Sequence, residues 1–144
     1  MIKSITNTQE HISLLEAFLN DAGTSLKTFR YFGKRPLDII KNHKYTILLL
    51  NDNEVPVAYG HLDLSDDVIW LGICVSENHM GKGYGHLVME DLLQKADSEG
   101  ILEITLQVDK VNYIAVNLYK KFNFITSEEK DGLYLIMKRC KNGI

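Results

Sequence analysis

The sequence predicts an α+β fold in one domain covering residues 1–144. First, three consecutive apolar runs are joined by polar turns too short for crossover helices, so we expect antiparallel strands at 45–50, 55–64 and 68–75. Second, a helical pattern separates the last of these strands from an alternating strand pattern at 101–108. Third, two strand patterns flank Asp131-Gly132, a pair typical of hairpins, at 125–130 and 133–139.

The elements before the first hairpin are shorter. Residues 2–6 predict an edge strand. Asn7 and Thr8 can cap a helix that ends near Gly23, with apolar positions at Ile12, Leu14, Leu15, Phe18 and Leu19. Residues 24–44 are irregular apart from a short helical piece after Pro36, a residue that suits a first helical turn.

Two further helices are predicted in the second half of the chain. The first ends at Gly100 and carries apolar residues at helical spacing, namely Tyr84, Leu87, Val88, Leu92 and Ala96. The second covers residues 111–122.

Composition excludes several classes of protein. A net charge of −3 argues against a nucleic-acid binder that neutralises phosphates. The apolar runs are far shorter than the ~20 residues needed to cross a bilayer and the N-terminus lacks an apolar signal core, so we expect a cytoplasmic protein with no membrane partner. Cys74 and Cys140 are expected to be reduced thiols, and neither the cysteines nor the histidines have metal-ligand spacing.

The stretch at residues 68–89, VIWLGICVSENHMGKGYGHLVM, is the most informative. It joins an apolar strand to a helix through a turn with three alternate glycines, Gly81, Gly83 and Gly85. Without side chains, the amides of this turn can approach an anion at the start of the helix. A tight strand-to-helix turn without a ligand would use the same glycines.

Two common phosphate loops do not match this turn. A P-loop needs Ser or Thr after its lysine, whereas Gly83 follows Lys82. A dinucleotide fingerprint belongs at the first turn of a parallel sheet, whereas this turn follows three hairpin-linked strands.

Residues 80–85, Met-Gly-Lys-Gly-Tyr-Gly, instead resemble the acyl-coenzyme A signature of GNAT-type N-acetyltransferases. That signature is Gln or Arg, two variable residues, Gly, a variable residue, then Gly or Ala, at the start of a helix. Met80 departs from the usual Gln or Arg, in a motif whose ligand contacts come largely from main-chain amides.

A second segment supports the resemblance independently. The family commonly carries, after its fifth strand, an Asn, an Ala three residues on, a Leu-Tyr pair and a Gly-Phe pair. The matching residues are Asn112, Ala115, Leu118, Tyr119 and Phe124. Asn123 stands where glycine is usual, and Asn tolerates a left-handed helix cap well.

The resemblance implies a twisted, mostly antiparallel sheet of about six or seven strands flanked by about four helices. It also implies a bulge in the fourth strand that splays it from the fifth and opens a slot for acetyl-CoA. The residues expected to bind this cofactor are Ile73, Cys74, Val75, Met80, Gly81, Lys82, Gly83, Tyr84, Gly85, His86, Asn112 and Tyr119.

For the chemistry, the resemblance implies that Tyr119 returns a proton to the departing thiolate and that an amide near Val75 polarises the thioester carbonyl. On spacing alone Tyr119 could equally be a core residue. The candidates for general base are His61, Asp63, Glu77 and His79. Cys74 is not expected to act as a nucleophile, because direct transfer needs no acyl-enzyme.

The segment before the second strand is expected to contact the acceptor, with Phe29, Arg30, Tyr31 and Arg35 joined by His61 and Asp63. Its aromatic and basic residues could stack on a planar group and pair with an anion, as in an amino sugar or a sugar nucleotide. Alternatively, the aromatic residues are core and the cations are solvated.

The expected function is direct acetyl transfer from acetyl-CoA to a primary amine of a small molecule, by a monomer or homodimer. Two alternatives stay open, a non-catalytic acyl-CoA-binding regulator and a protein or peptide N-acetyltransferase.

Overall fold

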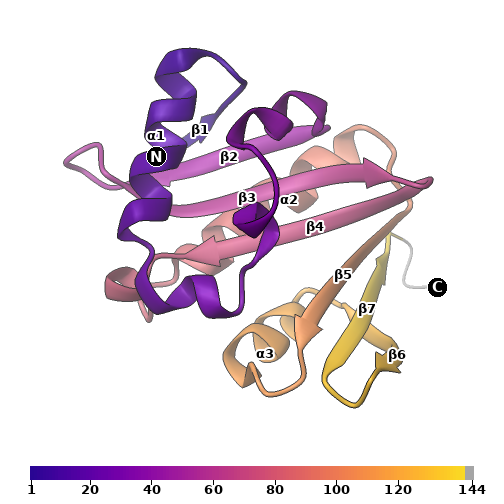
Figure 1. Ribbon diagram of the computed structural model, residues 1–144. Coiled ribbons are helices and arrows are strands. Elements are labelled where there is room, and N and C mark those ends of the chain that lie inside the picture. Colours follow the sequence, from indigo (N-terminus) through magenta and orange to yellow (C-terminus); the bar gives the residue numbers. More distant parts are fainter. Residues whose placement is uncertain (142–144) are drawn as a thin grey trace.

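The computed structural model describes residues 1–141, which contain a seven-stranded sheet in the order β1-β2-β3-β4-β5-β7-β6 (Figure 1). The strands are β1 Ile2–Ser4, β2 Tyr45–Leu50, β3 Pro56–Ser65, β4 Val68–Val75, β5 Glu103–Asp109, β6 Ile125–Lys130 and β7 Tyr134–Cys140. β4 and β5 are parallel, and the other neighbouring strands are antiparallel. The predicted α+β class and the predicted order of the strands and α-helices along the chain are confirmed.

Three α-helices and four short 3₁₀ helices lie within the described residues. They are α1 Gln9–Asp21, α2 Tyr84–Ser98 and α3 Tyr113–Lys121, with η1 Gly23–Lys27, η2 Tyr31–Gly33, η3 Leu37–Asn42 and η4 Glu77–His79. The Thr8 side chain accepts a hydrogen bond from His11 N and caps α1 as predicted. None of the helices within residues 1–141 is both long and apolar enough to span a membrane.

The helices divide between the two faces of the sheet. α1 and the η1–η3 segment cover one face, and α2 covers the other (Figure 1). Alternate residues of the central strands therefore enter different cores, so that Ile47 faces α2 whereas Leu48 packs with α1. Burial of both faces explains why these strands read as continuous apolar runs.

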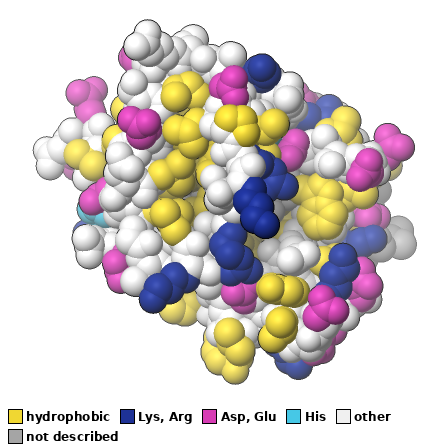
Figure 2. Space-filling model, in the orientation of Figure 1, with side chains coloured by type: hydrophobic (Ala, Val, Ile, Leu, Met, Phe, Trp, Pro, Cys, Tyr) yellow, Lys and Arg dark blue, Asp and Glu magenta, His cyan; other side chains and the backbone are white. Residues whose placement is uncertain are grey.

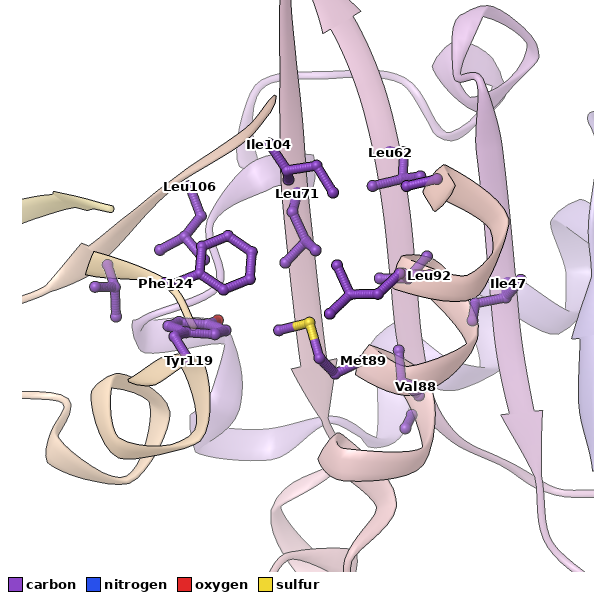
Figure 3. Close-up of a cluster of buried hydrophobic side chains, with 14 of the residues drawn as sticks. Ile47, Leu62, Leu71, Val88, Met89, Leu92, Ile104, Leu106, Tyr119 and Phe124 are labelled. Carbon is purple, nitrogen blue, oxygen red and sulfur yellow. The ribbon is translucent and has the colours of Figure 1, made fainter. Parts of the chain in front are cut away.

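The core on the α2 side extends to α3. Figure 3 shows Val88, Met89 and Leu92 of α2 pointing toward the sheet, with Tyr119 and Phe124 next to Leu106 of β5. The α2 helix comes close to β3 because Gly60 has no side chain: a Cβ there would lie 2.5 Å from Val88 Cγ1.

β4 and β5 diverge after one registered pair, Trp70 with Thr105 (Figure 1). The bulge implied by the resemblance is not found, because β4 pairs with β3 in unbroken register from Val68 to Val75. β5 pairs with β7 along its whole length instead. The split therefore arises because each strand follows its own antiparallel partner while the sheet twists.

Candidate functional site

The split between β4 and β5 leads into a cleft of about 1180 Å³. Its walls come from the end of β4, the glycine turn, α3, the end of β5 and the segment that contains η1 and η2. The cleft therefore brings together segments from both halves of the chain.

Main-chain groups of both strands face this opening. Ser76 N donates to Val57 O at 2.9 Å, so the alternation of antiparallel pairing directs the main-chain groups of Ile73 and Val75 away from β3 and toward β5. Lys110 N donates to Leu133 O at 2.8 Å. By the same alternation, the main-chain groups of Gln107 point away from β7 and toward β4. Ser25 Oγ occupies one of these groups by donating to Val75 O at 2.6 Å.

The glycine turn presents free amides at the start of α2. Gly81 and Gly83 have φ angles of +78° and +81°, which L side chains rarely adopt, and nothing lies within 4 Å of an added Cβ at either position. These two glycines are therefore required by backbone conformation rather than by space. Within the described part of the chain, the amides of residues 81–86 donate to no other residue.

Gly85 and Asn112 have structural contacts at the same end of the cleft. A Cβ at Gly85 would lie 3.3 Å from Leu118 Cδ2, so this glycine lets α2 approach α3. Asn112 Oδ1 accepts from Ala115 N at 3.3 Å and caps α3. His86 pairs with Glu90 at 2.9 Å and lines the cleft. Met80 and Tyr84 also line it, whereas Lys82 does not.

Tyr119 is a buried side chain at the wall of the cleft, 7% exposed, with its ring centroid 6.0 Å from that of Phe124. Its hydroxyl has no hydrogen-bond partner in residues 1–141. Every fully buried side-chain oxygen or nitrogen in these residues has a partner, so the Tyr119 hydroxyl is not fully buried. The hydroxyl therefore reaches the cleft. Burial raises the pKa of Tyr119, so the phenol is neutral and can donate a proton.

Cys74 lines the cleft from β4. Burial raises the pKa of its thiol to about 12, which keeps the sulfur protonated at neutral pH. This agrees with the expectation that Cys74 is not a nucleophile.

The four candidate bases lie in different places. His61 and Asp63 line the cleft from β3, and His79 lines it from η4. Glu77 does not line it, because its carboxylate accepts from Thr24 Oγ1 at 2.6 Å and from Thr24 N at 3.3 Å. These hydrogen bonds lower the pKa of Glu77 and commit it to the start of η1.

The aromatic and basic segment reaches the cleft through Phe29, Arg30, Tyr31 and Arg35. Lys and Arg side chains gather across the middle of this face, over the segment that contains η1 and η2 (Figure 2). Arg30 Nη2 pairs with Asp109 Oδ1 at 2.9 Å and so links this segment to the end of β5. The Arg35 guanidinium stacks on the Tyr31 ring, 4.2 Å from its centroid.

Several residues that line the cleft had no signal in the sequence that marked them for the site, among them Ser25, Trp70, Gln107 and Asp109. Ser25 lies in an irregular segment, and the other three become neighbours of the site because β4 and β5 diverge. A prediction of the strand register would have been needed to find Trp70, Gln107 and Asp109.

The residues present fit coenzyme A. The free amides at the start of α2 suit a diphosphate, and the unpaired main-chain groups of β4 and β5 suit the amide-containing arm. Within residues 1–141, no group of three or more His, Cys, Asp or Glu side chains could hold a metal ion.

The chain is similar to known N-acetyltransferases in sequence and in fold. Over 80 residues the chain is 38% identical to the uncharacterized N-acetyltransferase YobR of Bacillus subtilis (strain 168), an alignment that covers 55% of this chain and 32% of that protein's length. The PaiA N-acetyltransferase from Thermoplasma acidophilum, solved in complex with coenzyme A, has a TM-score of 0.72 at 15% identity, covering 97% of this chain and 99% of that one. Ribosomal-protein-alanine N-acetyltransferase from Brucella melitensis has a TM-score of 0.76 at 17% identity, covering 97% and 99%.

These two structures share the fold with this chain. The model of the acetyltransferase (GNAT) family matches residues 12–124, which is most of the sequence. The two motifs found in the sequence, at the glycine turn and in α3, both lie within that match. The chain belongs to the acetyltransferase (GNAT) family.

Proposed function

We propose that this protein transfers an acetyl group from acetyl-CoA directly to the primary amine of a small molecule. The observation that carries the proposal is the cleft itself, where a cradle of free amides, the diverging edges of β4 and β5 and a neutral phenol line one continuous space. Bound acetyl-CoA supplies the activated thioester.

The chain's own groups have three tasks in this proposal. The amides of residues 81–86 and the start of α2 hold the diphosphate. The amide of Val75 faces the opening and donates to the thioester carbonyl, where negative charge develops in the transition state. Tyr119 gives its proton to the sulfur that leaves.

The test measures binding and turnover separately. Calorimetry with acetyl-CoA checks the cradle, and release of free thiol on a panel of amines, amino sugars and peptides checks transfer. Tyr119→Phe should lower kcat about 10²-fold or more with little change in acetyl-CoA affinity. Absence of heat with acetyl-CoA would refute the proposal. Binding without thiol release on the whole panel would favour a non-catalytic regulator, and release with peptides alone would favour protein acetylation.

For the acceptor we propose a small polar amine, with an amino sugar or a sugar nucleotide as the first candidates. Tyr31 and Phe29 offer ring faces, and the Arg35 guanidinium lines the same part of the cleft. Arg30 is paired with Asp109, so Arg35 is the better partner for an acceptor anion. Unchanged turnover of anionic acceptors by Arg35→Ala would refute this assignment.

The proposal places the reaction in the cytoplasm, since Cys74 and Cys140, the protein's two cysteines, are both free thiols. One chain supplies every residue named for the site, so a monomer suffices for the chemistry.

A further inference from the structure

His61 and Asp63 lie two positions apart on β3 and therefore on the same face of the sheet. Their Cα atoms are about 7 Å apart at the spacing of a strand. Both side chains line the cleft, and their cross-strand partners on β4 are Gly72 and Trp70. Each side chain ends a separate chain of hydrogen bonds, and these chains determine which of the two can donate.

The first chain holds Asp63. Tyr31 Oη donates to Asp63 Oδ2 at 3.1 Å, and His43 Nε2 lies 2.7 Å from the same hydroxyl. An ionised carboxylate can only accept, so Tyr31 donates its single phenol proton to Asp63. The Tyr31 oxygen must then accept from His43, which carries its proton on Nε2. His43 Nδ1 then accepts from Thr46 Oγ1, 2.8 Å away.

This arrangement makes Tyr31 a positioning residue. It holds one oxygen of Asp63, whereas Oδ1 has no hydrogen bond to any residue of the described range 1–141. The carboxylate therefore keeps a free accepting atom in a residue that lines the cleft.

The second chain holds His61. Tyr59 is fully buried, and its hydroxyl lies 2.6 Å from His61 Nδ1, its one partner among the described residues. A buried phenol proton with a single acceptor in reach is donated to that acceptor. His61 therefore carries its proton on Nε2.

His61 Nε2 lies directly over Gly72, where an added Cβ would come within 2.6 Å of it. The absence of that side chain leaves room for the ring on the cleft side of β4. Nε2 has no partner in residues 1–141, where no fully buried polar side-chain atom is unpaired, so it is reached from the cleft. Burial lowers the pKa of His61 well below its ordinary value, which keeps the ring neutral.

Other charged and titratable groups surround this pair. Arg35 and His43 both influence the ionisation of neighbouring side chains here, and Arg35 Nη1 donates to Tyr31 O at 2.8 Å. Asp63 is the anionic group to which the Tyr31 chain leads. Asp63, an anionic acceptor, and two N–H-bearing side chains, His61 and Arg35, thus line the same cleft.

We propose that Asp63 binds the ammonium group of the acceptor and takes its proton, while His61 Nε2–H donates to an oxygen of the same molecule. This proposal rests on the function proposed above. The substrate class is a primary amine with a hydroxyl or carboxylate oxygen a few bonds from the nitrogen. Amino sugars belong to this class, whereas simple alkylamines do not. His61 is then a specificity residue and not the general base.

The tautomer is tested on the free protein, without any turnover. Two-bond ¹H–¹⁵N correlation spectra at pH 7 should show His61 and His43 as neutral rings protonated at Nε2. A His61 ring protonated at Nδ1, or at both nitrogens, would overturn the proposal.

Kinetics test the substrate class with 2-aminoethanol and propylamine, which has a methyl group in place of the hydroxyl. The protein should prefer 2-aminoethanol in kcat/KM by about tenfold or more, as expected for one lost hydrogen bond at about 1.4 kcal/mol per factor of ten. His61→Leu should abolish that preference. Tyr59→Phe serves as the second variant. It keeps the His61 imidazole but removes the hydroxyl that sets the imidazole tautomer, so it should weaken the preference.

Two further variants test Asp63. Asp63→Asn should lower kcat/KM for both amines at least about tenfold, because it removes the charge that attracts the ammonium group. Tyr31→Phe should lower kcat/KM for both amines and keep the preference. The matched control is Tyr45→Phe, which deletes another phenol–carboxylate hydrogen bond, to Asp91 at 2.8 Å, outside the cleft.

The outcomes separate the two proposals. Failure of the unmodified protein to release thiol with any amine would defeat the proposed function, and the histidine spectra would still decide the present inference. Acetyl transfer without a preference for 2-aminoethanol, or a preference that survives His61→Leu, would defeat the inference alone.

Discussion

Replacing Gly83 by alanine tests the glycine turn, because the expected effect is purely conformational. Gly83 has φ +81° at the N-cap of α2, and nothing lies within 4 Å of an added Cβ. An L residue in this region costs about 1–2 kcal/mol. That loss corresponds to a fall of about 3–8 °C in Tm for a chain of this size. If the turn relaxes to negative φ instead, the amides rotate away from the cradle. Either response should weaken binding of CoA.

The assay combines denaturant unfolding with calorimetric titration of CoA. Gly33→Ala is the matched control, since Gly33 has no positive φ and also has nothing within 4 Å of an added Cβ, so its effect should stay within about 0.5 kcal/mol. Gly83→Asn should cost less than Gly83→Ala, because Asn tolerates the left-handed region. Equal stability and equal CoA affinity for Gly83→Ala and Gly33→Ala would refute the role of backbone conformation.

Three other predictions concern stability and reactivity. Gly60→Ala should destabilise the protein by about 1–3 kcal/mol in denaturant unfolding, because its Cβ would overlap Val88 Cγ1 at 2.5 Å; a neutral result would contradict the close packing of α2 on β3. Hydrogen bonds from Arg139 hold the pKa of Asp97 below its ordinary value, so their stabilisation is present above about pH 4 and is lost as the pH falls through the folded-state pKa. Asp97→Asn should therefore unfold more easily at pH 7, with a difference that narrows below about pH 4; a pH-independent difference would count against the pair. Cys74, 4% exposed and with its pKa raised to about 12, should resist alkylation at pH 8 in the folded protein, and rapid labelling there would contradict its burial.

Much of the fold was predictable because it depends on local signals. Polar turns of a few residues require antiparallel neighbours, so β2, β3 and β4 followed from spacing alone, and their bounds differ by at most one residue from those expected. The two motifs identified the family before the sheet order was known, because they lie on contiguous segments of the chain.

The sequence predicted where β4 and β5 diverge, but it did not predict why they diverge. The family resemblance implied a bulge, whereas β4 stays in unbroken register with β3. Sheet twist and competition between antiparallel partners act over whole strands, so no single residue marks them in the sequence.

The candidate site shows the same division. Gly81 and Gly83 were predicted to expose main-chain amides because they lack side chains, and the structure adds that both have positive φ angles. Glu77 was named as a candidate base from its position after β4, yet it binds Thr24, a residue 53 positions away. Arg30 was assigned to the acceptor and is found beside Asp109, 79 positions away.

The sequence by itself determined the order of the elements, the glycine turn before α2 and the family, because each depends on short-range periodicity or on the conformational freedom of single residues. The tertiary structure alone decided which nitrogen of His61 faces the cleft and which oxygen of Asp63 is free. Those roles depend on the direction of hydrogen bonds between side chains that come from η2, from His43 after η3, and from β2 and β3. Such directions follow from which donors have a single acceptor within reach, and that is a property of three-dimensional proximity.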